Sequence, residues 1–187
     1  MPFPLGYMAT LATAQGDGNA VAATASQTSL LTGTGASQAV CTLPANWIDH
    51  AGQHLKVYAA GRLSTPASTQ GNLTFTLKVG SVNACVSPTF TSQASQTTIT
   101  WELDWDFTVR AVGSGTTTTL MHTGKFVSAL VSATNLMNLI PATAPAVGTG
   151  FDSTVSNTVD LQVTWSNNTA GNTITLHQYT LMSLINY

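Results

Sequence analysis

Charged residues are scarce in this chain. They make up 6% of its 187 residues, against roughly 25% in an ordinary globular domain. Five basic residues against seven acidic ones give a net charge of -2. The basic residues stand singly, so we expect no nucleic-acid partner. Low charge reduces the desolvation cost of burying surface against another subunit, and we expect extensive contact between copies; the alternative is a bland surface.

Long apolar runs are missing as well. No run is long enough to cross a bilayer, and the start MPFPL has neither the basic residues nor the apolar middle of a signal peptide. We therefore expect no membrane partner. The expected site of synthesis is the cytoplasm, from which lysis can release the protein.

Cysteine is nearly absent, with Cys41 and Cys85 the two present. They permit one bridge, but a reducing compartment and the lack of CxxC spacing favour free, buried thiols. His50 and His54 have the spacing of two ligands on a helix, yet the AGQ between them argues against a helix. GxSxG, HExxH, phosphate-loop and calcium-loop patterns are all missing. We predict no catalytic residue, no metal site and no cofactor, and expect that the protein is not an enzyme.

The segment from Thr97 to Val112, TTITWELDWDFTVRAV, carries the clearest pattern in the chain. Apolar side chains fall at every odd position from Ile99 to Val109, and polar ones fill the even positions between them. Successive side chains of a strand point to opposite faces, so this period of two predicts a long strand with one face on a core. Trp101 and Trp105 share the apolar face. We expect them to pack in the core rather than to stack on sugars.

The opposite face of the same strand carries the densest charge in the sequence. We predict a polar strip that faces solvent or another subunit, formed by Glu102, Asp104, Asp106 and Arg110. Carboxylates this close repel one another unless cations pair with them, and Arg110, Arg62 and Lys125 are the candidates. Residues i and i+2 lie about 7 Å apart, a separation suited to paired catalytic carboxylates. A hydrolase is nevertheless a remote alternative, because nothing in the sequence marks a pocket.

Alternation and turn residues recur through the rest of the chain. The last segment, 173–187, changes phase near His177, which predicts a bulge, and Gly61 marks a bulge or a close approach. About seven or eight strands and almost no helix predict an all-β fold, an antiparallel β-sandwich. An immunoglobulin-like topology is open, but the length of the chain and the early position of Trp47 favour a jelly roll.

Residues 1–27 differ in composition from the remainder. They are rich in Ala, Gly and Thr, with two early prolines and no sustained period. We predict an extended N-terminal arm over 1–27 and a jelly-roll β-sandwich domain over 28–187. The apolar residues expected to anchor this arm on a capsid or a neighbouring subunit are Phe3, Leu5, Tyr7 and Met8. A disordered terminus is the alternative.

Five segments taken in order carry a likeness to a known family. They read SLLTGTGASQAVCTLPANW, LKVYAAGRLST, GNLTFTLKVGS, WELDWDFTVRAVGSG and TLMHTGKFV. From about residue 28 to the C-terminus this pattern resembles the small jelly-roll structural proteins of tailed bacteriophages, which are assigned as head decoration or other virion components.

The resemblance implies a function for the chain. It implies a non-enzymatic capsid decoration or cement protein of the virion, which forms a homotrimer and binds the outer surface of the phage head. The major capsid protein would be the partner, and the head would gain stability. The alternative is a domain associated with a tail, spike or fibre that binds host-surface glycans or a receptor. The N-terminal arm is the least matched part.

Overall fold

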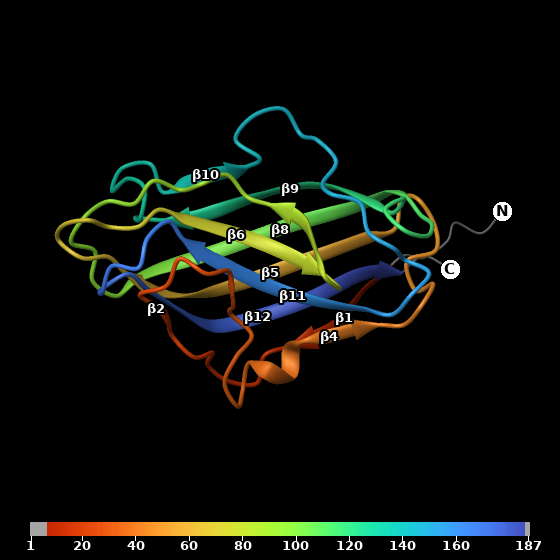
Figure 1. The fold of residues 1–187 in the computed structure, drawn as a ribbon, viewed down its shortest axis with the longest axis horizontal. Helices are drawn as coiled ribbons and strands as arrows, with labels where there is room; N and C mark the ends of the chain where they lie inside the picture. Colours follow the sequence, from red (N-terminus) through yellow and green to blue (C-terminus); the bar gives the residue numbers. More distant parts are fainter. Residues whose placement is uncertain (1–6, 186–187) are drawn as a thin grey trace.

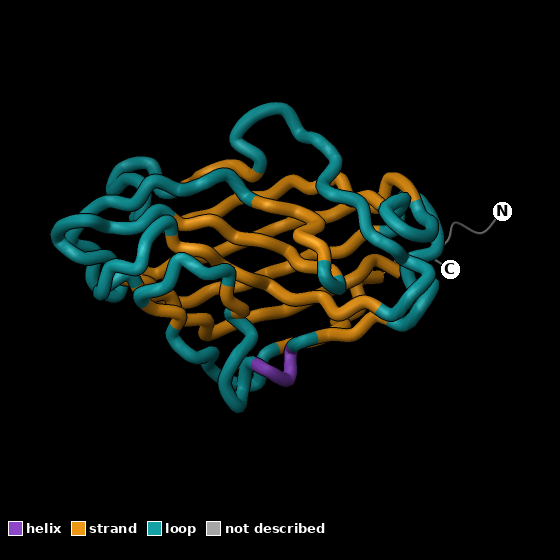
Figure 2. The backbone as a smooth tube through the Cα atoms, in the orientation of Figure 1, coloured by secondary structure: helices purple, strands orange, loops and turns teal. Residues whose placement is uncertain are grey.

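The computed structural model describes residues 7–185 and shows two antiparallel sheets packed face to face (Figure 1). Strands and loops account for almost all of the chain, and the helical segment in Figure 2 is the single turn η1 (Ser37–Ala39). Within 7–185, no helix has the length and apolar character needed to cross a membrane. The predicted all-β antiparallel sandwich is confirmed. Phe3 and Leu5 lie outside the described residues.

The larger sheet has the order β1-β12-β5-β8-β9-β10, and β2 also pairs with β12. Its strands are β1 (Tyr7–Thr13), β2 (Val21–Ala22), β5 (His54–Ser64), β8 (Ile99–Ala111), β9 (Thr119–Ser128), β10 (Met137–Ile140) and β12 (Thr173–Ile185). Within β12-β5-β8-β9, β12, the latest of the four strands in the sequence, lies beside β5, the earliest.

The smaller sheet has the order β3-β11-β6-β7, and β4 also pairs with β11. Its strands are β3 (Thr28–Ser29), β4 (Cys41–Leu43), β6 (Leu73–Val79), β7 (Val82–Val86) and β11 (Asn157–Trp165). The described residues thus form twelve strands rather than the seven or eight predicted. Several of the additional strands have two to four residues, too few for a period of two to be visible in the sequence.

The core lies between the two sheets and is rich in aromatic rings. Trp101, Trp105 and Trp165 are all 0% exposed. The Phe75 ring joins the sheets, with its centroid 5.5 Å from that of Trp101 and 5.3 Å from that of Phe126. The predicted core position of the tryptophans is therefore confirmed. Their burial also removes these three rings from any role in stacking on sugars.

The described part of the expected N-terminal arm is attached along the sandwich. β1 pairs with β12 from Tyr7 opposite Ile185 to Thr13 opposite Thr180. Beyond β1, the amide of Gly18 donates to the carbonyl of Leu176 at 2.9 Å. The described residues up to 27 therefore lie along their own sandwich, with β1 and β2 paired to β12, rather than forming the separate arm predicted from composition.

A bulge in β12 meets a glycine in β5. The pairing of these strands shifts between Leu176 and Gln178, which confirms the irregularity predicted near His177. Gly61 lies opposite Leu176, and a Cβ atom at Gly61 would be 2.0 Å from the carbonyl oxygen of Thr175. Of the two roles predicted for Gly61, the structure shows the close approach, since the extra residue belongs to β12.

The buried side of β8 also holds a titratable partner. His122 on β9 is 7% exposed, and its Nδ1 accepts a hydrogen bond of 3.1 Å from the indole Nε1 of Trp105. Burial lowers the pKa of His122 below its ordinary value of 6.5. The neutral ring is the form that accepts the indole proton. Folding therefore favours neutral His122.

Gly61→Ala should destabilise the fold. The new methyl group would collide with the backbone of β12, so we expect the free energy of unfolding to fall by about 2 kcal/mol. Urea denaturation followed by tryptophan fluorescence measures the change. The control is Ala60→Ser at the half-buried neighbouring position, expected to stay within about 0.5 kcal/mol of the parent. Equal midpoints for Gly61→Ala and the parent would contradict the close approach.

Acid should weaken the protein partly through His122. Because its pKa is lower in the folded state, the unfolded chain binds the proton first as pH falls. This contribution to stability is present above pH 6.5 and declines as pH drops below that ordinary value. We expect His122→Gln, which keeps an acceptor for the Trp105 indole, to lose less stability than the parent between pH 7 and pH 5. Denaturation curves at both pH values test this, with exposed His50→Gln as control; parallel losses in parent and variant would refute it.

Candidate interaction surface

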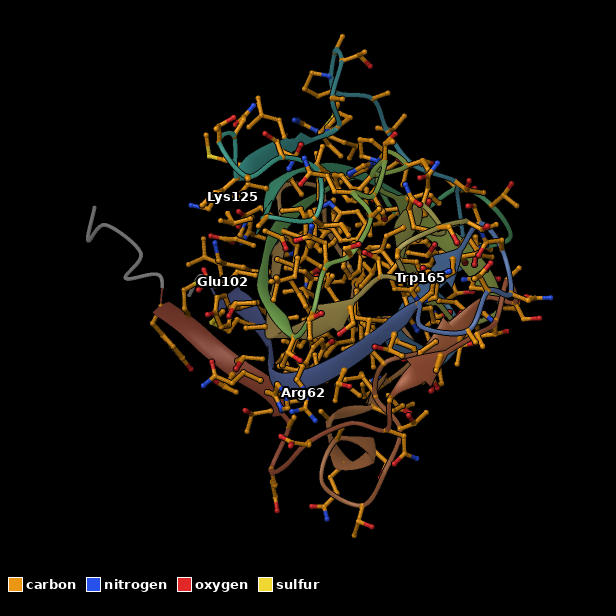
Figure 3. All side chains as sticks on the ribbon, turned by 90° about the vertical axis from the view of Figure 1, so that its left-hand side faces the viewer. Arg62, Glu102, Lys125 and Trp165 are labelled. Carbon is orange, nitrogen blue, oxygen red and sulfur yellow. The ribbon has the colours of Figure 1, made fainter. Side chains whose placement is uncertain are left out.

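The outward face of the larger sheet carries most of the charge that this chain possesses. Along β8 the odd-numbered residues from Trp101 to Val109 are buried and the even-numbered ones point away from the core. Figure 3 shows Glu102 and Lys125 on one side of the molecule and Trp165 on the other. The strip predicted from alternation is therefore an outer surface of the sandwich. The register of β5 and β9 decides which side chains meet it.

Strand pairing places one cation of β5 beside two acids of β8. Lys56 lies opposite Asp106, and Tyr58 lies opposite Asp104. The ammonium group of Lys56 forms an ion pair with Asp104 and a second one, at 3.3 Å, with Oδ2 of Asp106. His54 completes the group, with Nε2 3.2 Å from Oδ1 of Asp106. One lysine thus offsets the repulsion between neighbouring carboxylates.

We call Glu102, Asp104, Asp106, Lys56 and His54 the carboxylate cluster. Partial burial lowers the pKa of Lys56, but the hydrogen bonds and negative charges of Asp104 and Asp106 outweigh it and leave the pKa raised. The cation is therefore held in its charged form. Beside it, burial and the charges of Glu102 and Asp104 raise the pKa of Tyr58, which keeps the phenol protonated.

The remaining member of the predicted strip lies apart from these ion pairs. Arg110 is exposed at a register shift between Val109 and Ala111, near the end of β8. The sequence also proposed Arg62 and Lys125 as partners. Arg62 on β5 lies opposite Thr100, while Lys125 on β9 lies opposite Asp104. The ion pairs run instead to Lys56 and His54. Their even-numbered positions in the HLKVY segment marked them as outward-facing, but only the register shows which acids they meet.

The carboxylate cluster lies on an open sheet face. Asp104 and Asp106 are partly exposed, at 31% and 35% of their side-chain surface. Within 7–185, no three His, Cys, Asp or Glu side chains are grouped so that they could hold a metal ion. Both cysteines are free, as expected, and burial raises the pKa of Cys85 to about 12. Charge fixed in place by ion pairs, as in the carboxylate cluster, suits recognition of another surface.

Apolar side chains gather at the two outer edges of the same sheet. At the β1 edge, Tyr7 is 48% and Met8 is 44% exposed, as the predicted contact role requires. At the opposite edge, the β10 patch consists of Leu136, Met137 and Leu139, which are 44%, 52% and 61% exposed. Figure 1 shows β10 along the upper side of the molecule and β1 along the lower side. Sequence reasoning missed the β10 patch, although the apolar run NLMNLI was a signal for it.

Comparison with known proteins gives no family for this chain. No family model matches the sequence, and no curated protein matches it. Function is therefore inferred from the sandwich, the carboxylate cluster and the two apolar edges.

Removing the shared cation should destabilise the sheet. We expect Lys56→Met to lower the free energy of unfolding at pH 7 by about 1 kcal/mol, because Asp104 and Asp106 would face each other without it. Since folding raises the pKa of Lys56, the contribution is complete at neutral pH and is lost as pH rises beyond the ordinary value of 10.5. Urea denaturation at pH 7 and pH 11 measures both effects.

Lys125→Met is the matched control for this experiment. Lys125 is an exposed lysine opposite Asp104, but the ion pairs run to Lys56. We expect a change below about 0.5 kcal/mol. A larger loss from Lys125→Met than from Lys56→Met would show that the cluster is held from β9 instead.

Proposed function

We propose that this chain is a non-enzymatic virion protein, a capsid decoration or cement protein that forms trimers and binds the outer surface of a bacteriophage head. The observation that carries the proposal is a sandwich whose larger sheet ends in two uncharged, apolar edges. Its partners are copies of itself and the major capsid protein. Nucleic acid and membranes play no part in this proposal.

The sequences of the edge strands support a role in assembly. β1 reads YMATLAT and β10 reads MNLI, and neither contains a charged residue. Soluble proteins usually protect open edges with charge, proline, bulges or very short strands, because an exposed edge pairs with other chains. Here the protection consists of a register shift in β1 between Thr10 and Ala12 and of the four-residue length of β10, without charge, and both edges keep exposed apolar side chains. Such surface is typical of an interface between subunits.

The positions of the two edges support a closed ring. β1 and β10 lie at opposite ends of one sheet and differ in sequence, so contact between them is head-to-tail. A head-to-tail contact closes into a ring when the rotation between copies permits it. We propose a ring of three. The outward charge of the carboxylate cluster then remains available to face a capsid.

The jelly-roll topology and the likeness to bacteriophage proteins belong to this proposal. The return of β12 to lie beside β5 supports them, since a late strand that returns to the first is a feature of the Greek keys from which jelly rolls are built. In the smaller sheet, β11 lies between β4 and β6. The N-terminal residues ahead of β1 are assigned to contact with a neighbour.

Two measurements on the purified protein test the function. Native mass spectrometry should give a trimer, and sedimentation with heads that lack this chain should show saturable binding together with a higher temperature of head disruption. In the control, heads that already carry the protein should show no further binding. A monomer that stays in the supernatant would overturn the proposal. A trimer that does not bind heads would instead favour a position in another part of the virion.

A further inference from the structure

A groove runs beside β10, where the two sheets part. It has a volume of about 550 Å³. One wall comes from β10 and residues on either side of it, and the other from the segment 88–91. Its apolar lining comes from Pro88, Phe90, Val131, Met137, Leu139 and Ala142. No charged side chain lines the groove, so an uncharged apolar ligand fits its chemistry.

One residue of the groove, Asn138, needs a hydrogen-bond acceptor. Its side chain lines the groove, and its Nδ2 is buried without a hydrogen-bond partner among the described residues. Buried amide donors are nearly always paired in folded proteins, because an unpaired one is costly. A rotation of the Asn138 side chain toward the groove would let a backbone carbonyl there accept this hydrogen bond. The groove therefore suits a peptide better than a purely apolar molecule.

The backbone of β10 is also open on the side away from the sheet. β10 is the last strand in its sheet, and among residues 7–185 it pairs with β9 alone. An extended peptide adds to such an edge through main-chain hydrogen bonds, while alternate side chains fill a neighbouring pocket. Edge, groove and unpaired amide lie on the same four-residue strand. Together they describe a docking site for a short apolar segment.

We propose that this site takes residues 2–6 of a second copy of the chain. That segment reads PFPLG and carries no charge. Phe3 and Leu5 are two residues apart, so in an extended chain they point the same way, about 7 Å from each other. Pro4 disfavours helical conformation at Phe3 and so favours this extended form. The segment thus offers two apolar side chains to the groove and a carbonyl to Asn138.

Residues 2–6 are too short to lie in the groove of their own copy, so a different copy must supply them. Residues 1–6 precede β1, whereas the groove adjoins β10, and β12, β5, β8 and β9 lie between those strands. Five inter-strand steps span about 24 Å. Six extended residues reach at most about 20 Å, with none left over to lie in the groove. A copy therefore receives this segment from its neighbour and gives its own to the next.

This inference rests on the self-association in the proposed function and names its contact. The first test compares assembly of three variants by sedimentation velocity over a range of concentrations. Deletion of residues 2–6 and Leu139→Asp should each raise the dissociation constant about tenfold or more. Val155→Asp changes another exposed apolar residue, 50% accessible and in the loop before β11, and should leave it unchanged.

The second test identifies the donor and the acceptor. In a Cys41→Ala background, tagged chains with Leu5→Cys are coexpressed with untagged chains with Ala142→Cys and oxidised. We expect a disulfide between the tagged and untagged chains. The control replaces Ala142→Cys with Val155→Cys and should give none.

The outcomes separate this inference from the proposed function. If the deletion variant assembles as tightly as the parent, the segment is not the contact, while self-association still stands. If chains that carry both Leu5→Cys and Ala142→Cys form the bridge within one chain, the segment folds back and the exchange is refuted. If the parent is a monomer, the inference and the proposed function both fail.

Discussion

The burial of one face of β8 is the constraint on which the rest of this molecule depends. Trp101, Trp105 and Phe107 must enter the core together, because residues of one parity share a face of a strand. The same geometry forces the acids of β8 to the outside, next to one another. The aromatic core and the charged surface are therefore two faces of a single strand, and neither can be moved without the other.

β5, which pairs with β8, supplies the residues that this arrangement needs on both faces of the sheet. On the outer face it supplies Lys56, whose ammonium group forms ion pairs with both Asp104 and Asp106. On the inner face, Gly61 leaves room for the close approach of β12, and Trp101 donates its indole proton to the carbonyl of Arg62 at 3.2 Å. β5 thus pairs with the acids of β8 on the outer face, leaves room for the backbone of β12 and accepts the indole hydrogen bond of Trp101. Its central place in the larger sheet brings all three contacts together.

The sandwich completes its core without closing its edges. Paired strands satisfy the interior backbone, but among the described residues β1 and β10 each pair with one neighbouring strand of the sheet and present exposed apolar side chains. A chain with so few charges has little with which to protect such edges. Assembly is the physical solution that the proposed function adopts: copies of the chain cover the apolar edges, and the carboxylate cluster on the outer face of the larger sheet remains available to a capsid.

Alternation along the chain was enough to determine the all-β class, the core position of Trp101 and Trp105, and the irregularity near His177, because each follows from the direction of successive side chains. The tertiary structure alone decided the partners. It selected Lys56 rather than Arg62 or Lys125, paired residues 7–13 with β12, and placed β10 beside the segment 88–91. Periodicity is a local property, whereas register joins strands far apart in sequence. The side chains that meet across two strands are fixed only when those strands pair.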